Sequence, residues 1–297
     1  MNTSPTHEHH RYVINFGQMA EDDARKWPDL MEIVERRVKP DRNKDKRDVR
    51  RRYWWRFAES APALYATIRG LPRVLAIARV SQSAAFAFLP ASIVLSEQLV
   101  VFALSAHAAF TTLQARPHEV WARFFASSMK DDLRYTPSDC FETFPFPDGW
   151  QTNPALEATG KAYYDFRAAL MVKNDEGLTK TYNRFHDPDE RSPDILKLRA
   201  LHADMDRAVL DAYGWRDIPT ACQFLLDHDD GPDDDEEAGK KRKRKPYRHR
   251  WPDDVRDEVL ARLIELNRAR AEDEKKRGLA VTRKARPEGE EEDEGEG

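Results

Sequence analysis

The sequence predicts an α+β fold, in which a mixed domain with a small sheet flanked by helices precedes a mainly helical C-terminal domain. Three strand-like runs, rich in Val, Ile, Leu and Phe, lie between residues 73 and 104, with helix-like segments on either side. After residue 149, apolar side chains recur at the three- and four-residue spacing of amphipathic helices. With 297 residues, of which 40% are hydrophobic, the chain is long enough for one large or two ordinary domains.

Composition shifts divide the chain further. Acidic residues crowd residues 227–237 and basic residues crowd residues 240–250, a pattern typical of a mobile linker whose two halves attract each other. The Glu- and Gly-rich end cannot bury apolar surface, which predicts disorder. The predicted parts are a disordered tail (1–11), the mixed domain (12–148), the helical domain (149–226), the charged linker (227–247), a C-terminal helix (248–277) and a second disordered tail (278–297).

The charge balance gives little information on partners when it is summed over the whole chain. The formal net charge is -4, which does not suggest a nucleic-acid binder. Acidic and basic residues are segregated along the sequence, however, and local patches decide which partners a surface attracts. The basic segments therefore have to be examined one by one.

The cysteines and the hydropathy pattern indicate a cytoplasmic protein. Cys140 and Cys222 have neither a disulfide framework nor the spacing of a metal site, which predicts two unpaired thiols in a reducing compartment. No apolar run reaches the length that crosses a membrane, and no signal-peptide pattern is present. We therefore expect no membrane partner and no metal.

Proline and glycine mark most element boundaries in the mixed domain. Pro28 and Pro62 suit the first turn of a helix, where proline loses no hydrogen bond and its φ is already helical. Pro40 is predicted to stop the second helix, and Gly70 to end the third. In order, we expect a strand (12–17), helices (19–25, 28–38, 62–69), strands (73–80, 84–89 and within 92–104) and helices (106–115, 118–127).

A basic run over residues 42–52 leads directly into Tyr-Trp-Trp at residues 53–55. Each Lys or Arg that neutralises a phosphate releases counterions, and arginine can bond phosphate oxygens with two N–H groups. The run therefore fits contact with a DNA backbone, although a solvated linker has the same composition. The two tryptophans are expected in the core. The candidate phosphate-contacting residues of this run are Arg47, Arg50, Arg51 and Arg52.

A polar loop between the first two long strands has side chains suited to reading bases. Glutamine can bridge adenine, arginine can bridge guanine, and serine can bond either base in the major groove. A generic turn has the same composition, so the residues alone leave both interpretations open. The candidate base-reading residues are Arg79, Ser81, Gln82 and Ser83.

Residues 131–147 combine a polar start with three large rings. Pro145 and Pro147 exclude a helix there and favour an extended run. Because aromatic side chains are most often buried, the rings of this run are predicted to fill a seam between domains. Arg134 is a further candidate for phosphate contact, or it braces that seam. His118 has no nucleophile or orienting acid beside it in the sequence, which favours a structural role.

The helical domain shows clearer signals. A helix is expected over residues 153–172, followed by a loop rich in side-chain donors at residues 182–188. Ser192, followed by proline and an acid, predicts the start of a long helix that Gly214 closes. A last helix is expected to begin after Trp251.

Several of these motifs, taken together, resemble a known family. They are Arg-Tyr-Thr at residues 134–136, Cys-Phe-Glu-Thr-Phe-Pro-Phe-Pro at residues 140–147, Tyr-Asn-Arg-Phe-His-Asp at residues 182–187 and Asp-Ala-Tyr-Gly-Trp at residues 211–215. In this order they are similar to the C-terminal half of MmeI-like type IIG/IIL single-chain DNA methyltransferases and restriction–modification enzymes. The resemblance covers most of residues 11–270.

The resemblance implies a target recognition domain followed by a helical C-terminal domain, with double-stranded DNA as partner. It also implies an adenine-specific methyltransferase domain, which would bind S-adenosylmethionine and precede Met1 or belong to another chain. The sequence has no Pro-Pro dipeptide and no Gly-x-Gly after a strand, so neither the cofactor loop nor the Asn/Asp-Pro-Pro-aromatic motif of such enzymes is found. We therefore expect no cofactor and no catalytic residue in this chain.

Two other classes of function remain open from the residues. A non-catalytic interaction or structural module would carry the charged segments only for solubility. A self-contained enzyme would need a nucleophile or metal constellation, and no Walker loop, zinc spacing or Ser-His-Asp order is found in the sequence. Steep salt dependence of DNA binding distinguishes a recognition module from an interaction module.

Overall fold

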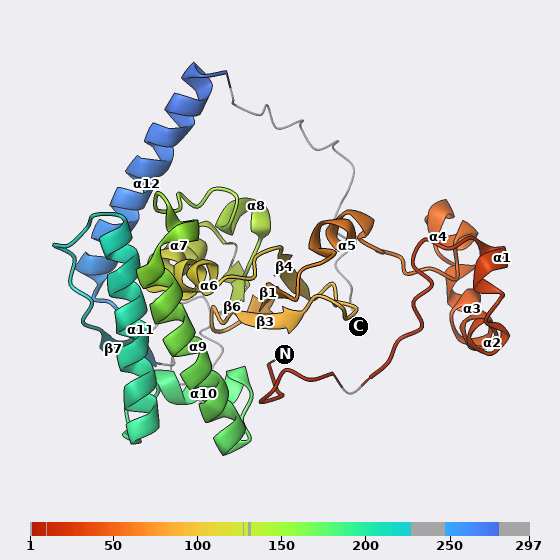
Figure 1. Cartoon of the computed structure of the whole chain (residues 1–297), viewed down its shortest axis with the longest axis horizontal. Coiled ribbons are helices and arrows are strands. Elements are labelled where there is room, and N and C mark those ends of the chain that lie inside the picture. Colours follow the sequence, from red (N-terminus) through yellow and green to blue (C-terminus); the bar gives the residue numbers. More distant parts are fainter. Residues whose placement is uncertain (1, 10, 127, 130–131, 227–246, 279–297) are drawn as a thin grey trace, which may run out of the picture.

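The computed structural model describes residues 2–9, 11–126, 128–129, 132–226 and 247–278 (Figure 1). It confirms the predicted α+β fold, in which small antiparallel sheets are flanked by helices and a mainly helical region follows. Most of the predicted charged linker and all but Gly278 of the second predicted tail lie outside the described residues. Among the described residues, no helix is both long enough and apolar enough to cross a membrane.

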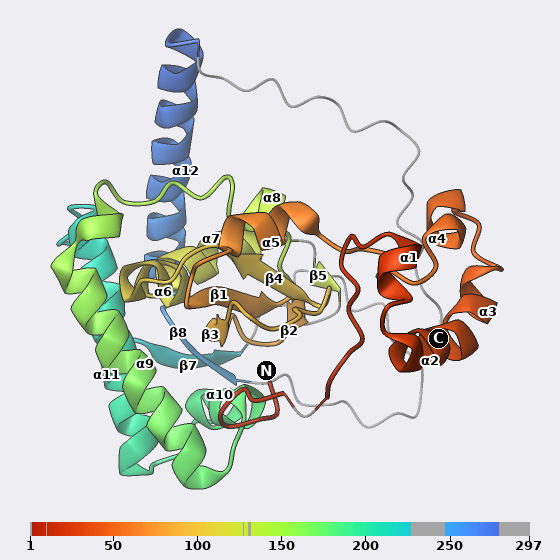
Figure 2. The same cartoon turned by 45° about the vertical axis from the view of Figure 1, so that its right-hand side comes forward.

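Four short helices form a lobe with its own small core at the N-terminal end, set apart from the sheets in both views (Figures 1 and 2). Trp54 and Trp55 are buried in it beside Phe16, as the sequence predicts for the two tryptophans. A fifth helix joins this lobe to the sheets. The helices are α1 (Glu21–Ala24), α2 (Pro28–Arg37), α3 (Lys39–Arg42), α4 (Asp48–Arg52) and α5 (Pro62–Ile68).

One prediction for this lobe is wrong. Residues 12–17 are described without a strand; Gly17 has a φ of 53° and donates its N–H to Asn15 Oδ1 (2.9 Å), which makes a turn. Phe16 is buried in the core that the helices of the lobe form, so residues 12–17 do not need to pair as a strand to bury it. Helix α2 ends at Arg37, before Pro40, as predicted, and Pro40 itself lies in the first turn of the next helix, α3, where a missing N–H costs no hydrogen bond.

The central sheet has the strand order β3-β1-β4, built from β1 (Arg73–Ala78), β3 (Ala87–Pro90) and β4 (Leu99–Phe102). Leu75 and Ile77 point into the main core, whereas Val74 and Ala76 pack with Ile68 on the opposite face. Both faces of β1 are therefore buried, which explains its nearly continuous apolar sequence.

A second small sheet begins where the first strand ends. β2 (Val80–Ser81) pairs with β6 (Asp132–Arg134), which also pairs with β5 (Ser128–Met129). Arg79 connects the two sheets through its backbone: its N–H donates to Gln98 O, and its carbonyl accepts from Tyr135 N, both at 2.8 Å. The predicted strand over residues 73–80 is thus two strands in two sheets.

Helices α6 (His107–Gln114) and α7 (Arg116–Phe125) follow β4, with Pro117 in the first turn of α7. The segment after β6 is not extended throughout, contrary to prediction. Pro137 opens the short helix α8 (Pro137–Cys140), and the later prolines restrict only the residues beside them. The aromatic run does form a seam, because Phe146 packs against two separate core clusters. Cys140 is buried and unpaired, as expected.

The helical region packs two long helices against α6. Its elements are η1 (Trp150–Thr152), α9 (Pro154–Asn174), α10 (Leu178–His186), α11 (Pro193–Ala212), β7 (Gln223–Leu226), β8 (Tyr247–Arg250) and α12 (Asp253–Lys276). Gly214, with a φ of 79°, follows α11 as predicted. The loop predicted at residues 182–188 is wrong for most of its length, because Tyr182 and Phe185 lie on α10 and are both buried.

Three contacts attach the helical region to the rest of the protein. At Gly160 the axes of α9 and α6 approach so nearly that a Cβ would lie 2.6 Å from His107 O. The N-terminal segment packs on the start of α10, where Thr179 N donates to Asn2 O (3.1 Å). At the other end, Val259 and Leu263 of α12 cover the aromatic surface that contains Trp121 and Phe144.

Candidate nucleic-acid interface

The candidate DNA-contacting residues gather in two places. Arg47 and the three arginines of α4 lie on the N-terminal lobe, whereas Arg79, the Ser81–Ser83 segment and Arg134 lie at the second sheet (Figures 1 and 2). The sheet brings Arg134 and Val80 into register, so residues that are far apart in sequence share one edge.

The arginines around α4 already have partners within the lobe. Arg50 Nη2 donates to Glu59 Oε1 (2.8 Å), and Arg51 Nη2 donates to Asp48 Oδ1 (3.0 Å). Arg47 lies 3.5 Å from Glu59, and the Arg47 side chain is 62% exposed. Arg52 is exposed and lies over the Tyr53 ring, 5.6 Å from its centroid. Exposed ion pairs contribute only about 0–1 kcal/mol, so a phosphate could compete for these side chains.

The segment of Ser81, Gln82 and Ser83, called here the Gln82 loop, presents side chains on a fixed backbone. The Gln82 side chain is exposed and forms no hydrogen bond with the described residues. Its backbone carbonyl, in contrast, accepts from Arg123 Nη2 (2.9 Å) and Arg248 Nη2 (2.6 Å). Ser83 N donates to Ser81 Oγ (3.4 Å), and Arg79 Nε donates to Glu97 O (3.2 Å).

Arg123 was not singled out from the sequence, and Arg248 was named only as part of the basic run over residues 240–250. Arg123 follows Glu119 by four residues on α7, and this helical spacing is the one signal that could have indicated its pairing. Arg248 is counted among the basic residues around the predicted linker, yet it is only 6% exposed and lies in β8. Its role depends on a contact with a residue 166 positions away, which no local pattern reveals.

Behind the Gln82 loop lies a group of charged and imidazole side chains, called here the buried polar cluster. Arg116, His202 and Asp206 are buried, and Glu119, His186 and His249 are half-buried. Arg116 forms an ion pair with Asp206 and donates its backbone N–H to Asp206 Oδ1 (2.8 Å). Burial raises the pKa of Asp206, but the charge of Arg116, the contact with His202 and the backbone hydrogen bond from Arg116 together outweigh it, so the pKa is lowered. Burial likewise raises the pKa of Glu119, but the charges of Arg123, Arg248 and Arg116 outweigh it and lower the pKa to about 2.

Three histidines, His118, His186 and His249, have lowered pKa values and are neutral at pH 7. Burial lowers the pKa of His118 to about 3, and burial together with Arg116 lowers the pKa of His249 to about 3. Burial and the charge of Arg248 hold the pKa of His186 well below its usual range, and the His186 Nδ1 atom accepts from His249 N (3.1 Å). His118 Nε2 is 2.9 Å from Tyr135 Oη, which fits the structural role predicted for this residue.

Stability is expected to fall between pH 6.5 and pH 5 because of these three histidines. In the unfolded chain they take up protons near pH 6.5, whereas in the folded chain they resist protonation, so the stabilisation is present above pH 6.5 and is lost as the pH falls. Each contributes a loss of up to about 1.4 kcal/mol per pH unit. Urea unfolding at pH 7, 6 and 5 measures the slope, which His118→Gln should reduce by about one third. A flat profile over this range would contradict the expectation.

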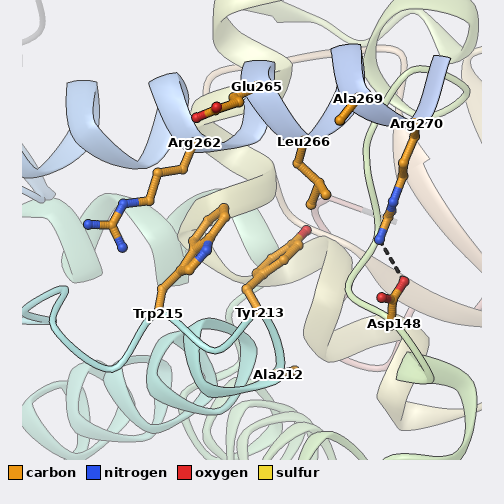
Figure 3. Close-up of a pocket in the computed structure, with 9 residues that line it drawn as sticks. All are labelled: Asp148, Ala212, Tyr213, Trp215, Arg262, Glu265, Leu266, Ala269 and Arg270. Carbon is orange, nitrogen blue, oxygen red and sulfur yellow. Dashed lines mark hydrogen bonds and ion pairs between the residues drawn. The ribbon is translucent and has the colours of Figure 1, made fainter. Parts of the chain in front are cut away.

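A separate groove of about 520 Å³ lies between α12 and the turn after α11 (Figure 3). Tyr213 and Trp215 stack there with their ring centroids 4.4 Å apart. Arg270 donates to Asp148 Oδ1 (2.7 Å), and Arg262 donates to Asp217 Oδ2 (2.6 Å). These bonds fasten α12 to the aromatic seam and to the turn. Across the described residues, no cluster of three His, Cys, Asp or Glu side chains could hold a metal ion.

Comparison with known proteins agrees with the motifs and the fold. Residues 4–148 match the family model of the MmeI target recognition domain. This part of the chain is similar to the target recognition domain of MmeI. A structure of the type IIL restriction–modification enzyme MmeI in complex with DNA aligns with a TM-score of 0.53 at 17% identity, covering 88% of this chain. The chain spans 29% of the length of that MmeI structure. No curated protein matches the chain. The resemblance to MmeI-like enzymes is thereby confirmed.

Proposed function

We propose that this chain is the DNA-binding specificity part of a site-specific restriction–modification enzyme of the MmeI type. The observation that carries the proposal is the match of residues 4–148 to the MmeI target recognition domain. The likeness in fold to MmeI, which was solved in complex with DNA, supports it. In this proposal residues 12–148 recognise the target, and residues 149–226 form the helical domain that supports them.

The proposed contacts divide into two kinds. Phosphates would be contacted by Arg134 and by the four arginines of the N-terminal lobe, Arg47, Arg50, Arg51 and Arg52. Such contacts fix the register of the protein on the duplex without reading its sequence. Arg79 and the Gln82 loop would read base edges. The exposed side chains of Arg79 and Gln82 on a hydrogen-bonded backbone suit this task, because little backbone freedom remains to be lost on binding.

The finer part of the proposal concerns the chemistry that recognition serves. We propose that the recognised duplex is presented to an adenine-specific methyltransferase domain that holds S-adenosylmethionine outside this chain. Such enzymes flip the target base out of the stack. The role of this chain would be to grip and read the duplex, in the cytoplasm, so that the other domain acts on one adenine.

The test is a mobility-shift titration of the purified chain on duplex DNA at two salt concentrations, with a labelled-methyl transfer assay on the same samples. Salt-sensitive binding without methyl transfer is the expected result. Methyl transfer would show that a cofactor site lies within the chain. Absence of binding at low salt would overturn the proposal and favour a protein-interaction module.

The two exposed arginines beside α4 allow a sharper test of the phosphate contacts. Replacing Arg47 and Arg52 with glutamine is expected to reduce the slope of log affinity against log salt by roughly 2, since each lost phosphate contact removes about 0.9. Lys197 on α11 is exposed, forms no ion pair with the described residues, and provides the control Lys197→Gln. An equal slope for the double variant and the control would exclude these phosphate contacts.

A further inference from the structure

Two arginines from distant parts of the chain bond the same backbone oxygen. Arg123 of α7 and Arg248 of β8 each donate from Nη2 to Gln82 O, at 2.9 and 2.6 Å. We infer that this pair, called here the arginine clamp, fixes the conformation of the Gln82 loop and makes Arg248 a positioning residue for sequence discrimination. The second half of the inference rests on the proposed function.

The clamp uses the full bonding capacity of one carbonyl. A carbonyl oxygen has two lone pairs, and both are occupied by charged donors, which form stronger bonds than neutral ones. Fixing this oxygen fixes the plane of the peptide between Gln82 and Ser83. The directions in which these two side chains leave the backbone are fixed with it.

The rest of the loop is held on either side of the clamp. Val80 and Ser81 before it are paired with β6, and Ala84 O beyond it accepts from Gln114 Nε2 (2.8 Å). Phe86 N then donates to Gln114 Oε1 (2.9 Å). Without the clamp, the backbone between these two anchors would be held only by the local bonds from Ser83 N to Ser81 Oγ (3.4 Å) and from Ala85 N to Ser83 O (2.9 Å). A locked backbone with an exposed Gln82 side chain is the arrangement that a reading loop requires.

Both arginines are themselves positioned by the buried polar cluster. Glu119 Oε1 accepts from Arg123 Nε (2.9 Å), and the carboxylate of Glu119 also balances the charge of Arg248. The strand that carries Arg248 is held by the bond from His249 N to His186 Nδ1 and by Arg116, which donates to His249 O (3.2 Å). A continuous series of bonds therefore links α10 and α11 to the Gln82 loop.

The consequence is that the β7–β8 pair takes part in recognition through Arg248, by positioning the Gln82 loop and not by contacting a base itself. Loss of the clamp should leave the phosphate contacts on the N-terminal lobe in place, because no clamp residue lies in that lobe. Total affinity would change little. Discrimination between base pairs would fall, because the loop would sample several conformations.

The clamp is tested in the full chain by hydrogen exchange of the peptide that spans residues 80–86. We expect Arg248→Met and Arg123→Met to accelerate its exchange about tenfold, with exchange in α9 unchanged. Arg248→Lys, which keeps one charged donor, should give an intermediate rate. Arg250→Met is the matched control, because Arg250 bonds Asp253 and Leu226 and not the loop. Unchanged exchange in both methionine variants would overturn the clamp.

The effect on recognition is measured by selection from a randomised duplex library at fixed salt. The wild-type chain is expected to enrich one motif, and the clamp variants to lose about tenfold discrimination at one or two positions while total affinity changes less than about threefold. An identical motif in wild type and variants, despite accelerated exchange, would overturn the positioning role. Failure of the wild type to enrich any motif would overturn the proposed function together with the positioning role, whereas the exchange experiment would still decide the clamp.

The Arg123→Met variant separates loss of the clamp from general destabilisation of the fold as the cause of lost discrimination. The Arg123 side chain is 29% exposed and its removal leaves a smaller buried gap than removal of Arg248, which is 6% exposed. If Arg248→Met alone lost discrimination and also exchanged faster in α9, the loss would be a general destabilisation. The same loss in Arg123→Met, with α9 protected, would confirm the clamp.

Discussion

Replacing Asp206 with alanine is expected to destabilise the protein by about 3–5 kcal/mol, because it leaves the Arg116 guanidinium buried without a countercharge. Asp206 is completely buried and Arg116 is 4% exposed, so water cannot take over the solvation of either group. A loss of this size is a large part of the stability of an ordinary domain. Thermal unfolding should shift down by roughly 10 °C, and urea titration should show the same loss in free energy.

Asp204 provides the matched control for this variant. It lies two residues earlier on α11, is exposed, and forms no ion pair with the described residues, so Asp204→Asn should change the unfolding free energy by less than about 0.5 kcal/mol. The double variant Arg116→Met with Asp206→Leu should be more stable than Asp206→Ala, since no charge is left unpaired. If Asp206→Ala were as stable as Asp204→Asn, the buried ion pair would have no net role.

Gly160→Ala is expected to cost about 3 kcal/mol even though alanine is the better helix former. In an exposed helix the same change would stabilise by roughly 1 kcal/mol. Here the new methyl group would overlap Thr111 Oγ1 and lie 2.6 Å from His107 O. The carbonyl belongs to the backbone of α6 and cannot rotate away, so α9 would have to move off the core.

Urea unfolding of Gly160→Ala beside Lys161→Ala separates packing from helix propensity. Lys161 is the next residue on α9, its side chain is 61% exposed, and its loss should change stability by less than about 0.5 kcal/mol. Adding Thr111→Ala to Gly160→Ala should restore only part of the loss, because the contact with His107 O remains. Stabilisation by Gly160→Ala would mean that the two helices can separate without cost.

Local signals predicted the parts of the fold that depend on neighbouring residues. The start of α11 after Ser192, the turn at Gly214 and the burial of Trp54 and Trp55 follow from short-range chemistry, and all are found. Even here one detail differs, because Ser192 does not cap the helix through its side chain; its Oγ accepts from Arg184 instead.

The parts of the fold that were not predicted from the sequence depend on contacts between residues far apart in the chain. The division of the first strand at Arg79 depends on β6, more than fifty residues later in the chain, and the β7–β8 hairpin pairs strands on either side of the predicted linker. The helix α10 was missed because its two buried rings stand among polar residues that resemble a loop. The candidate DNA-contacting residues remain predictions, since the structure places them and does not show what they bind.

The position of α12 has a consequence for synthesis of the protein. Trp121 and Phe144 are covered by Val259 and Leu263, which leave the ribosome only after more than a hundred further residues have been added. At ordinary elongation rates this aromatic surface stays uncovered for on the order of ten seconds. The nascent chain should therefore depend on chaperones during that interval, and chains that end before α12 should accumulate in inclusion bodies rather than in the soluble fraction.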